Sequence, residues 1–139
     1  MALCWLDDDS GGVKQHPKTE EFRVFTRPRP LYFFIHEEEG RIRGDLTAKT
    51  HSEYLKAQFL WVDEQHRSYG VAASELMISA ERVAPKRGCK NAFLDTLGSK
   101  ALEFYKRRGY SKFGRLSGFS GEHERYFLCR TLEPYSVHL

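Results

Sequence analysis

The chain has 139 residues, of which 40% are hydrophobic and 29% are charged, and its formal net charge is +3. This length suits one domain and is too short for a second one. No run of residues predicts a membrane-spanning helix, and the N-terminus lacks the pattern of a secretory signal. A net charge this small permits an anionic ligand, but it does not indicate the basic stripe of a nucleic-acid-binding protein.

The three cysteines (Cys4, Cys89 and Cys129) are an odd number without metal-ligand spacing. This usage suits a reducing cytoplasm better than a disulfide framework. Cys89 and Cys129 lie in strand-like sequences, where a free cysteine is usually a packing residue. The six histidines form no i, i+4 pair, so the sequence predicts no metal site.

Residues 1–30 indicate a loosely structured N-terminal arm, because an acidic run and a glycine pair precede a polar basic stretch. Within this arm, Glu21 to Phe25 alternates and could form an edge strand that ends at Arg27-Pro28-Arg29-Pro30. The basic segment Lys14 to Arg29 also allows docking to nucleic acid or to a protein partner. Such binding would have to weaken strongly with salt.

A hairpin follows the arm. Its predicted strands are Leu31 to His36 and Arg41 to Ala48, and Glu37 to Gly40 forms the turn between them. A polar linker then leads into the run Tyr54 to Arg87, which contains the most informative pattern of the sequence.

This run predicts a strand, a turn and a helix. The aromatic and β-branched residues Phe59 to Val62 favour a strand, which the polar residues Asp63 to His66 end. After Gly70, apolar residues recur at steps of three and four, so they share one face of a helix. Pro85 cannot lie inside that helix, which should therefore end near Val83. Gly88 is its expected cap.

The first turn of this helix is a candidate anion site, because the first backbone N–H groups of a helix lack partners and lie at its positive end. Gly70 gives the turn conformational freedom, and Arg67 can add a permanent charge. The alternative is an ordinary connection between a strand and a helix that happens to contain a glycine.

The rest of the chain predicts one more helix and three strands. Asn91 to Thr96 should form a strand parallel to the preceding one, since a helix connects the two. A helix then runs to Arg108, with Ser99 as its N-cap and Gly109 at its end. The last two predicted strands are Ser111 to Leu116 and Arg125 to Leu132, separated by a loop over Ser117 to Glu124.

Two motifs resemble those of the GNAT acetyltransferase superfamily. The first is Arg67-Ser68-Tyr69-Gly70-Val71-Ala72, directly after a strand, and the second is Ala101-Leu102-Glu103-Phe104-Tyr105-Lys106-Arg107-Arg108-Gly109-Tyr110. The resemblance covers about Leu31 to Leu132, as the acetyl-CoA-binding core of a single domain spanning residues 1–139. It implies an α+β fold with three α/β/α layers and a mixed, mostly antiparallel central sheet. The region before Leu31 is shorter than the strand and two helices with which the family shapes its acceptor pocket.

The resemblance also implies that acetyl-CoA is the cosubstrate and which residues contact it. In the family, the amides of the first motif hold the pyrophosphate, and the preceding strand pairs with the pantetheine arm. A polar residue near the second helix also contacts the cofactor. Carried over to this sequence, the binding residues are Leu60, Trp61, Val62, Arg67, Ser68, Tyr69, Gly70, Val71, Ala72, Ser99 and Tyr105.

Acetyl transfer to an amine needs a neutral nucleophile and a proton for the leaving thiolate. Keeping a lysine-like amine neutral at pH 7 costs about 4.6 kcal/mol, because its pKa is about 10.4. By the resemblance, Tyr105 is the candidate proton donor, and the alternative is that Phe104 and Tyr105 only pack a helix against the sheet. The central strand offers Gln58 where many family members have a glutamate base, and an amide cannot serve.

The base is therefore open. Glu64 is the first choice, and Asp63, His66 and Asp95 are alternatives. The sequence thus predicts a cytoplasmic N-acetyltransferase that acts on a primary amine of a small molecule or a peptide. The alternative is a CoA-binding protein of the same fold without efficient catalysis. The short N-terminal region also suggests a homodimer in which a partner's arm completes the acceptor pocket.

Overall fold

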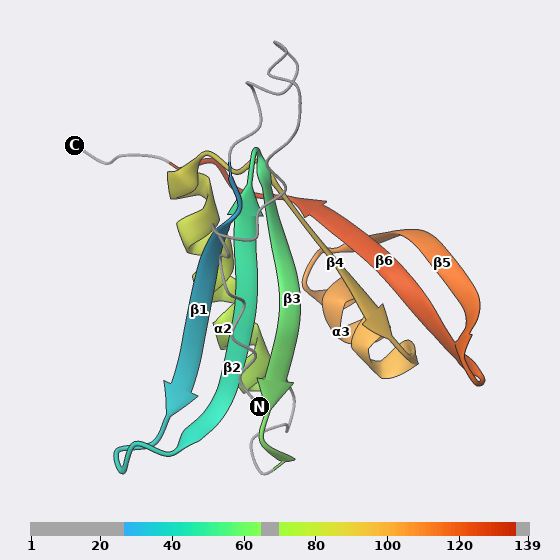
Figure 1. Ribbon diagram of the computed structural model, residues 1–139, viewed down its shortest axis with the longest axis horizontal. Coiled ribbons are helices and arrows are strands. Elements are labelled where there is room, and N and C mark those ends of the chain that lie inside the picture. The colour runs from blue at the N-terminus through green and yellow to red at the C-terminus, as the bar shows by residue number, and fades with distance from the viewer. Residues whose placement is uncertain (1–26, 65–69, 136–139) are drawn as a thin grey trace.

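The structure is a computed structural model that describes residues 27–64 and 70–135, and these residues form one sheet with its covering helices (Figure 1). The predicted edge strand at Glu21 to Phe25, most of the basic segment and the turn residues Arg67 to Tyr69 lie outside the described residues. The strands are β1 (Arg29–His36), β2 (Ile42–His51), β3 (Tyr54–Val62), β4 (Asn91–Leu97), β5 (Ser111–Ser120) and β6 (His123–Thr131). The helices are α2 (Val71–Val83), the short 3-10 helix η3 (Ala84–Arg87) and α3 (Ser99–Arg107).

The six strands lie in the order β1-β2-β3-β4-β6-β5. All neighbouring pairs are antiparallel except β3 and β4, which run parallel. The predicted parallel pairing, the α+β class and the mixed, mostly antiparallel sheet are therefore confirmed. The parallel pair requires a crossover connection, and α2 provides it.

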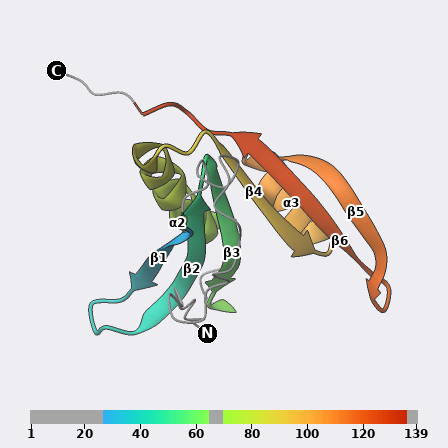
Figure 2. The same ribbon diagram turned by 45° about the horizontal axis from the view of Figure 1, so that its top comes forward.

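Both α-helices lie on the same face of the sheet, α2 behind β1 to β3 and α3 behind β4 and β6 (Figures 1 and 2). This placement follows from two right-handed crossovers that advance across the sheet in the same direction, β3 to β4 and then β4 to β5. Residues 27–64 and 70–135 thus form two layers, and a helical layer on the opposite face is not among them.

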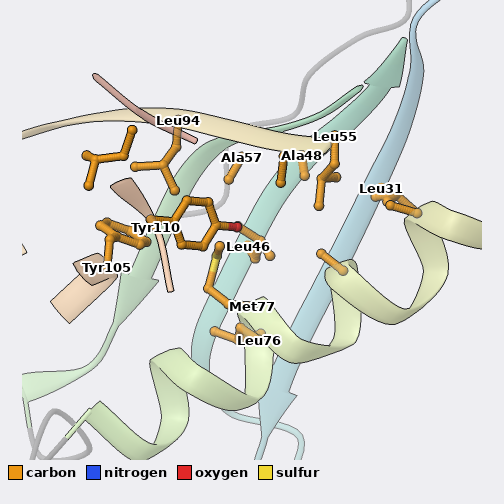
Figure 3. Close-up of a cluster of buried hydrophobic side chains, with 14 of the residues drawn as sticks. Leu31, Leu46, Ala48, Leu55, Ala57, Leu76, Met77, Leu94, Tyr105 and Tyr110 are labelled. Carbon is orange, nitrogen blue, oxygen red and sulfur yellow. The ribbon is translucent and has the colours of Figure 1, made fainter. Parts of the chain in front are cut away.

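The hydrophobic core fills the space between the sheet and the two helices (Figure 3). Alternate residues of β2, such as Leu46 and Ala48, point to this side and are buried against Leu76 and Met77 of α2. The largest fully buried apolar side chains are Leu46, Leu55, Leu76, Met77, Leu94 and Leu128. Each contributes about 1.5–3 kcal/mol through burial, and they come from β2, β3, β4, β6 and α2.

The ends of α2 are largely as predicted. The helix ends at Val83, and Pro85 lies in the first turn of η3, where its missing N–H costs nothing. Gly88 closes η3 with φ 92°, a left-handed conformation that favours glycine. For α3, the predicted N-cap is wrong by one residue, because the cap is Gly98 with φ 87° and Ser99 is the first helical residue.

The predicted loop over Ser117 to Glu124 is also wrong. Strand β5 continues to Ser120 and β6 begins at His123, so the turn between them is much shorter than predicted. Two register shifts in the β5–β6 pairing, between Lys112 and Gly114 and between Leu116 and Ser120, accommodate the irregular sequence. Such bulges allow a strand to pass residues that otherwise interrupt a ladder.

Candidate active site

The most distinctive feature of the sheet is the separation of β3 from β4. The two strands share only three paired positions, of which the last joins Lys56 and Phe93. Beyond it they diverge toward their carboxyl ends, as both ribbon views show (Figures 1 and 2). A cavity of about 320 Å³ lies in this gap. Its lining residues are Ala57, Gln58, Phe59, Leu60, Leu94, Asp95, Thr96, Leu97, Tyr105 and Arg125.

The cavity lies between the facing edges of the two strands, because its lining includes consecutive residues of both. Along their strands, Leu60 and Leu94 alternate with Phe59 and Asp95. The side chains of the first two therefore point to one face of the sheet, and those of the other two point to the opposite face. Strand β3 stays paired to β2 throughout, whereas its other edge has no paired strand among the described residues after Lys56. Every second N–H and C=O group of this edge therefore faces the gap, where an extended ligand could pair with it.

A β-bulge lies at the narrow end of the gap. The register of β2 against β3 shifts between Thr47 and Ala48, which leaves Gln58 as the extra residue of β3. Its Oε1 atom is buried and accepts no hydrogen bond from residues 27–64 or 70–135. Bulges of this kind re-aim backbone groups beside active sites. The sequence drew attention to Gln58 as an unsuitable base, but a bulge cannot be recognised without the register of β2.

The amino end of α2 has the properties of an anion site. Its N-cap is Gly70, with φ 69°, and within the described residues no side chain caps the helix. Its first turn contains no acidic residue, Val71 is exposed and Ala72 packs against the core. The first backbone N–H groups of such a turn suit a negatively charged ligand. Of the predicted turn, Gly70, Val71 and Ala72 can be placed, whereas Arg67, Ser68 and Tyr69 lie outside the described residues.

The two sequence motifs meet at Gly70. A Cβ atom built on this glycine would lie 3.1 Å from Cε1 of Phe104, on α3. Phe104 also packs against the core, as predicted. The contact places the first turn of α2 next to α3, which carries Tyr105 into the cavity.

Tyr105 lies in the cavity wall and is 8% exposed. Burial raises the pKa of its phenol to about 12, although the positive charge of Arg108 opposes the shift. The nearby Tyr110 is a structural residue in comparison, because its hydroxyl donates a hydrogen bond to Glu81 at 2.8 Å. The two rings make an edge contact with centroids 5.8 Å apart, within the cluster of Figure 3.

Asp95 and Arg125 form an ion pair in the cavity wall. Asp95 was one of the alternatives for the base, whereas sequence reasoning missed Arg125. The two lie on neighbouring antiparallel strands, in register positions two residues apart, and only the pairing of β4 with β6 could have revealed their contact.

The remaining predicted residues lie at the rim or outside the described chain. Glu64 is exposed, two residues beyond the end of β3. Asp63 is ion-paired with Arg43, which also binds Glu37 at 2.7 Å and so ties the end of β3 to the β1–β2 turn. Ser99 is exposed at the start of α3, two residues after Leu97 of the cavity wall. The alternative base His66 cannot be placed.

A protein-family model described as Acetyltransferase (GNAT) family matches residues 2–110. The chain belongs to this family. The match begins well before Leu31, where the motifs suggested that the resemblance starts, and it includes both motifs. The GNAT assignment agrees with the splayed β3–β4 pair and with the six-stranded mixed sheet.

Individual GNAT relatives support the assignment. The chain is 37% identical over 92 residues to the acetyltransferase Atu2258 of Agrobacterium fabrum strain C58, a match that spans 66% of each protein. A crystal structure of an acetyltransferase from Bacillus cereus ATCC 14579 superimposes with a TM-score of 0.71 at 33% identity, covering 82% of this chain and 79% of that one.

A third GNAT structure is more distant and shows the fold alone. It comes from Bacillus anthracis strain Ames and was solved in complex with acetyl coenzyme A. Its TM-score is 0.65 at 17% identity, and the match covers 75% of this chain and 63% of that one.

Residues 27–64 and 70–135 lack two other kinds of functional feature. No helix in this part of the chain is long and apolar enough to cross a membrane. It also holds no group of three or more histidine, cysteine, aspartate or glutamate residues arranged to bind a metal ion.

Proposed function

We propose that this GNAT-family chain is an acetyl-CoA-dependent N-acetyltransferase that acts on a primary amine of a small molecule or peptide. The observation that carries the proposal is the cavity between β3 and β4 with Tyr105 of α3 in its wall, together with the contact between Phe104 of the same helix and Gly70 at the start of α2. The first turn of α2 suits a phosphate group, and the cavity suits an acyl group.

Acetyl-CoA would supply an activated acetyl thioester, and the residues present fit its parts. The N–H groups of Val71 and Ala72 would bind the pyrophosphate, together with the predicted residues Arg67 to Gly70. The unpaired edge of β3 would pair with the pantetheine arm, as a missing strand would. A backbone N–H of the segment Leu60 to Val62 would then polarise the thioester carbonyl. The Bacillus anthracis protein, which has the same fold and holds acetyl coenzyme A, supports this use of the fold.

Tyr105 would provide the hydrogen bond to the leaving sulfur. Its side chain lines the cavity from α3, and its raised pKa keeps the hydroxyl protonated at neutral pH. For the base, Glu64 remains the first choice and would act through water from the rim. Asp95 lies closer to the reaction, but its carboxylate is held by Arg125.

A calorimetric titration with acetyl-CoA, followed by measurement of thiol release with a panel of amines, tests the proposal. We expect saturable binding by the wild-type chain and amine-dependent release of CoA thiol. The variant Gly70→Asp should weaken binding strongly, because it adds a carboxylate and a side chain where the phosphate would sit. Absence of binding by the folded wild-type chain would contradict the proposal.

The same measurements separate the alternative function. Binding of acetyl-CoA without thiol release for any amine would favour a CoA-binding protein that acts as a regulatory module. The homodimer and the cytoplasmic location remain predictions. Sedimentation velocity measures the first, and a strictly monomeric active enzyme would contradict the idea that a partner's arm completes the acceptor pocket.

A further inference from the structure

Glu81 of α2 is a mostly buried carboxylate that binds two residues at the end of α3. Its side chain is 10% exposed. The Oε1 atom accepts a hydrogen bond from Nη2 of Arg108 at 2.6 Å, and the Oε2 atom accepts one from the hydroxyl of Tyr110 at 2.8 Å. Arg108 is the C-cap of α3, and Tyr110 directly precedes β5. One carboxylate of α2 therefore holds the segment that connects α3 to β5.

The same two residues hold the backbone of Tyr105. The N–H groups of Arg108 and Tyr110 both donate to the carbonyl oxygen of Tyr105, each at 3.0 Å. The rings of Tyr105 and Tyr110 also lie side by side in an edge contact, with centroids 5.8 Å apart (Figure 3). A shift of Arg108 and Tyr110 would thus move the backbone and the ring of Tyr105 together.

The way in which Glu81 divides its two oxygens is unfavourable for Arg108. An arginine often binds a carboxylate through two parallel hydrogen bonds. Here the hydroxyl of Tyr110 occupies the second oxygen, and Nε of Arg108 is buried without an acceptor among residues 27–64 and 70–135. A buried donor in this state costs stability. An arrangement that is unfavourable for folding is expected where function requires it, so the bond between Glu81 and Tyr110 is a candidate functional contact.

Arg130 of β6 fixes the same segment from the sheet. Its Nη1 atom donates a hydrogen bond to the carbonyl oxygen of Arg108 at 2.7 Å and lies 3.9 Å from Oε1 of Glu81. Its guanidinium carbon lies 5.8 Å from the centre of the Tyr110 ring. The two residues that hold the carbonyl of Tyr105 are therefore held in turn from α2 and from β6.

Glu81 lies far from the proposed phosphate site, although both are on α2. It follows Gly70 by eleven residues, which is about 17 Å along the helix axis. Helix α2 thus contacts α3 in two separate places, at Gly70 through Phe104 and at Glu81 through Arg108. Because these contacts are far apart, a substitution at Glu81 should leave the first turn of α2 intact.

We propose that Glu81 is a positioning residue for Tyr105, acting through Arg108 and Tyr110. It fixes the hydroxyl of Tyr105 in the cavity wall, at the place where the thioester sulfur would lie. This inference rests on the proposed N-acetyltransferase function, in which Tyr105 provides the hydrogen bond to the leaving sulfur. A misplacement of about 1 Å greatly slows an enzyme reaction, so a change at Glu81 should lower turnover without weakening acetyl-CoA binding.

A double-mutant cycle tests the inference. Glu81→Gln should lower kcat for amine-dependent thiol release by about tenfold, but by less than about twofold in the Tyr105→Phe background. A residue that acts through the hydroxyl of Tyr105 has nothing left to position once that hydroxyl is gone. The Kd of acetyl-CoA, measured by calorimetry, should stay within about twofold of the wild-type value in each variant. Glu75→Gln, at an exposed position of the same helix, should change neither quantity.

Tyr110→Phe is a second variant, which keeps the ion pair between Glu81 and Arg108. It decides the question if Glu81→Gln fails to fold, because Glu81→Gln leaves the charge of Arg108 without its carboxylate. Tyr110→Phe removes only a hydroxyl, so the edge contact with Tyr105 remains. We expect kcat to fall by about threefold, again only where Tyr105 is present.

Each result decides the inference. Unchanged kcat in Glu81→Gln, an equal fall in both backgrounds or a parallel loss of acetyl-CoA binding would overturn it. Full activity of Tyr105→Phe would also overturn it, because no hydrogen-bond donor would then need to be positioned.

If the wild-type chain acetylates no amine, the proposed function fails, and the position of Tyr105 is measured directly. NMR of the chain with 13C-labelled tyrosine shows the ring signal of Tyr105, which is identified by its loss in Tyr105→Phe. This signal should shift in Glu81→Gln, or in Tyr110→Phe where Glu81→Gln does not fold, and should stay in place in Glu75→Gln. An unshifted signal would show that Glu81 does not position Tyr105.

Discussion

Tyr105 combines two properties with opposite consequences for catalysis. Its hydroxyl remains protonated up to very alkaline pH, since burial raises its pKa to about 12. A thiol has an ordinary pKa of about 8.5, so complete transfer of the phenol proton to a thiolate would be unfavourable. Tyr105 is therefore better suited to donate a hydrogen bond to the sulfur while charge develops than to give up its proton entirely.

For Tyr105→Phe we expect turnover to fall by about tenfold to a hundredfold, below the full range of a general acid. Binding of acetyl-CoA should change little, because the ring and its packing remain. The kinetic assay of thiol release, combined with calorimetry, measures both effects. If the activity of the wild-type chain changes with pH below about pH 10, Tyr105→Phe should show the same change, because the hydroxyl of Tyr105 does not ionise in that range. Full activity of Tyr105→Phe would remove this residue from the mechanism.

The residues of the site differ in how far sequence could identify them. Tyr105 and Gly70 were found through motifs, whose spacing is set within a single helix or turn. A contact between two strands has no such fixed spacing in the sequence. Arg125 escaped notice for the same reason, since its contact with Asp95 depends on strand pairing.

At the scale of the elements, the two motifs depend on each other. Gly70 needs its left-handed conformation, and the ring of Phe104 on α3 occupies the space where a side chain would lie. The first turn of α2 and the helix that carries Tyr105 are thus fitted together through a glycine. A change at this contact should affect binding of acetyl-CoA and the position of Tyr105 together.

Gly70→Ala tests this coupling, and Gly118→Ala is a matched control. The φ angles are similar, 69° at Gly70 and 64° at Gly118. A methyl group at Gly118 would meet no atom within 4 Å beyond its chain neighbours, whereas one at Gly70 would meet the ring of Phe104. We expect each variant to lose about 1 kcal/mol from the backbone conformation. Gly70→Ala should lose more and should also bind acetyl-CoA more weakly.

A second substitution isolates the contact. Phe104→Leu in the Gly70→Ala background should recover part of the added loss, because it removes ring atoms next to the new methyl group. Thermal unfolding and calorimetric titration measure the two effects. Equal destabilisation by Gly70→Ala and Gly118→Ala, with unchanged binding, would show that the contact with Phe104 is unimportant.

The elements themselves were mostly predictable, and the exceptions share a cause. Helical periodicity and Pro85 located α2, and alternation located most strands. The extension of β5 through Gly118 depends on its partner β6, and the divergence of β3 from β4 depends on which residues pair. Pairing between distant segments leaves no local signal, so the cavity could be expected only through the family resemblance.

At the scale of the whole molecule, the sheet has two different faces. The helix-covered face holds the core, including Leu46, Leu94 and Leu128. The opposite face carries an apolar hollow of about 460 Å³ lined by Tyr54, Phe93, Phe113 and Cys129. The cavity between β3 and β4 lies within the sheet, between these two faces, so a donor and an acceptor could approach the reacting carbon from opposite sides.

The core face also determines how the molecule responds to alkaline pH. Tyr105 and Tyr110 are both buried there, and burial is the main cause that raises the pKa of each above its ordinary value of about 10. A raised pKa in the folded state gives stability that is fully present below about pH 10. This stability is lost as the pH rises through the folded-state value, which is about 12 for Tyr105.

We therefore expect the free energy of unfolding to fall between about pH 10 and pH 12. The share of Tyr105 is about 3 kcal/mol, from a shift of about two pKa units. Tyr105→Phe should lose less stability across this interval than the wild-type chain. Tyr135→Phe, at an exposed position, should lose as much as wild type. Urea unfolding at several pH values measures the free energy of unfolding of each variant. Lysines also titrate in this range, so the prediction is tested by the difference between the wild-type chain and Tyr105→Phe. Parallel curves for wild type and Tyr105→Phe would mean that the phenol is solvated in the folded chain, which would also weaken its assignment as the hydrogen-bond donor of the cavity.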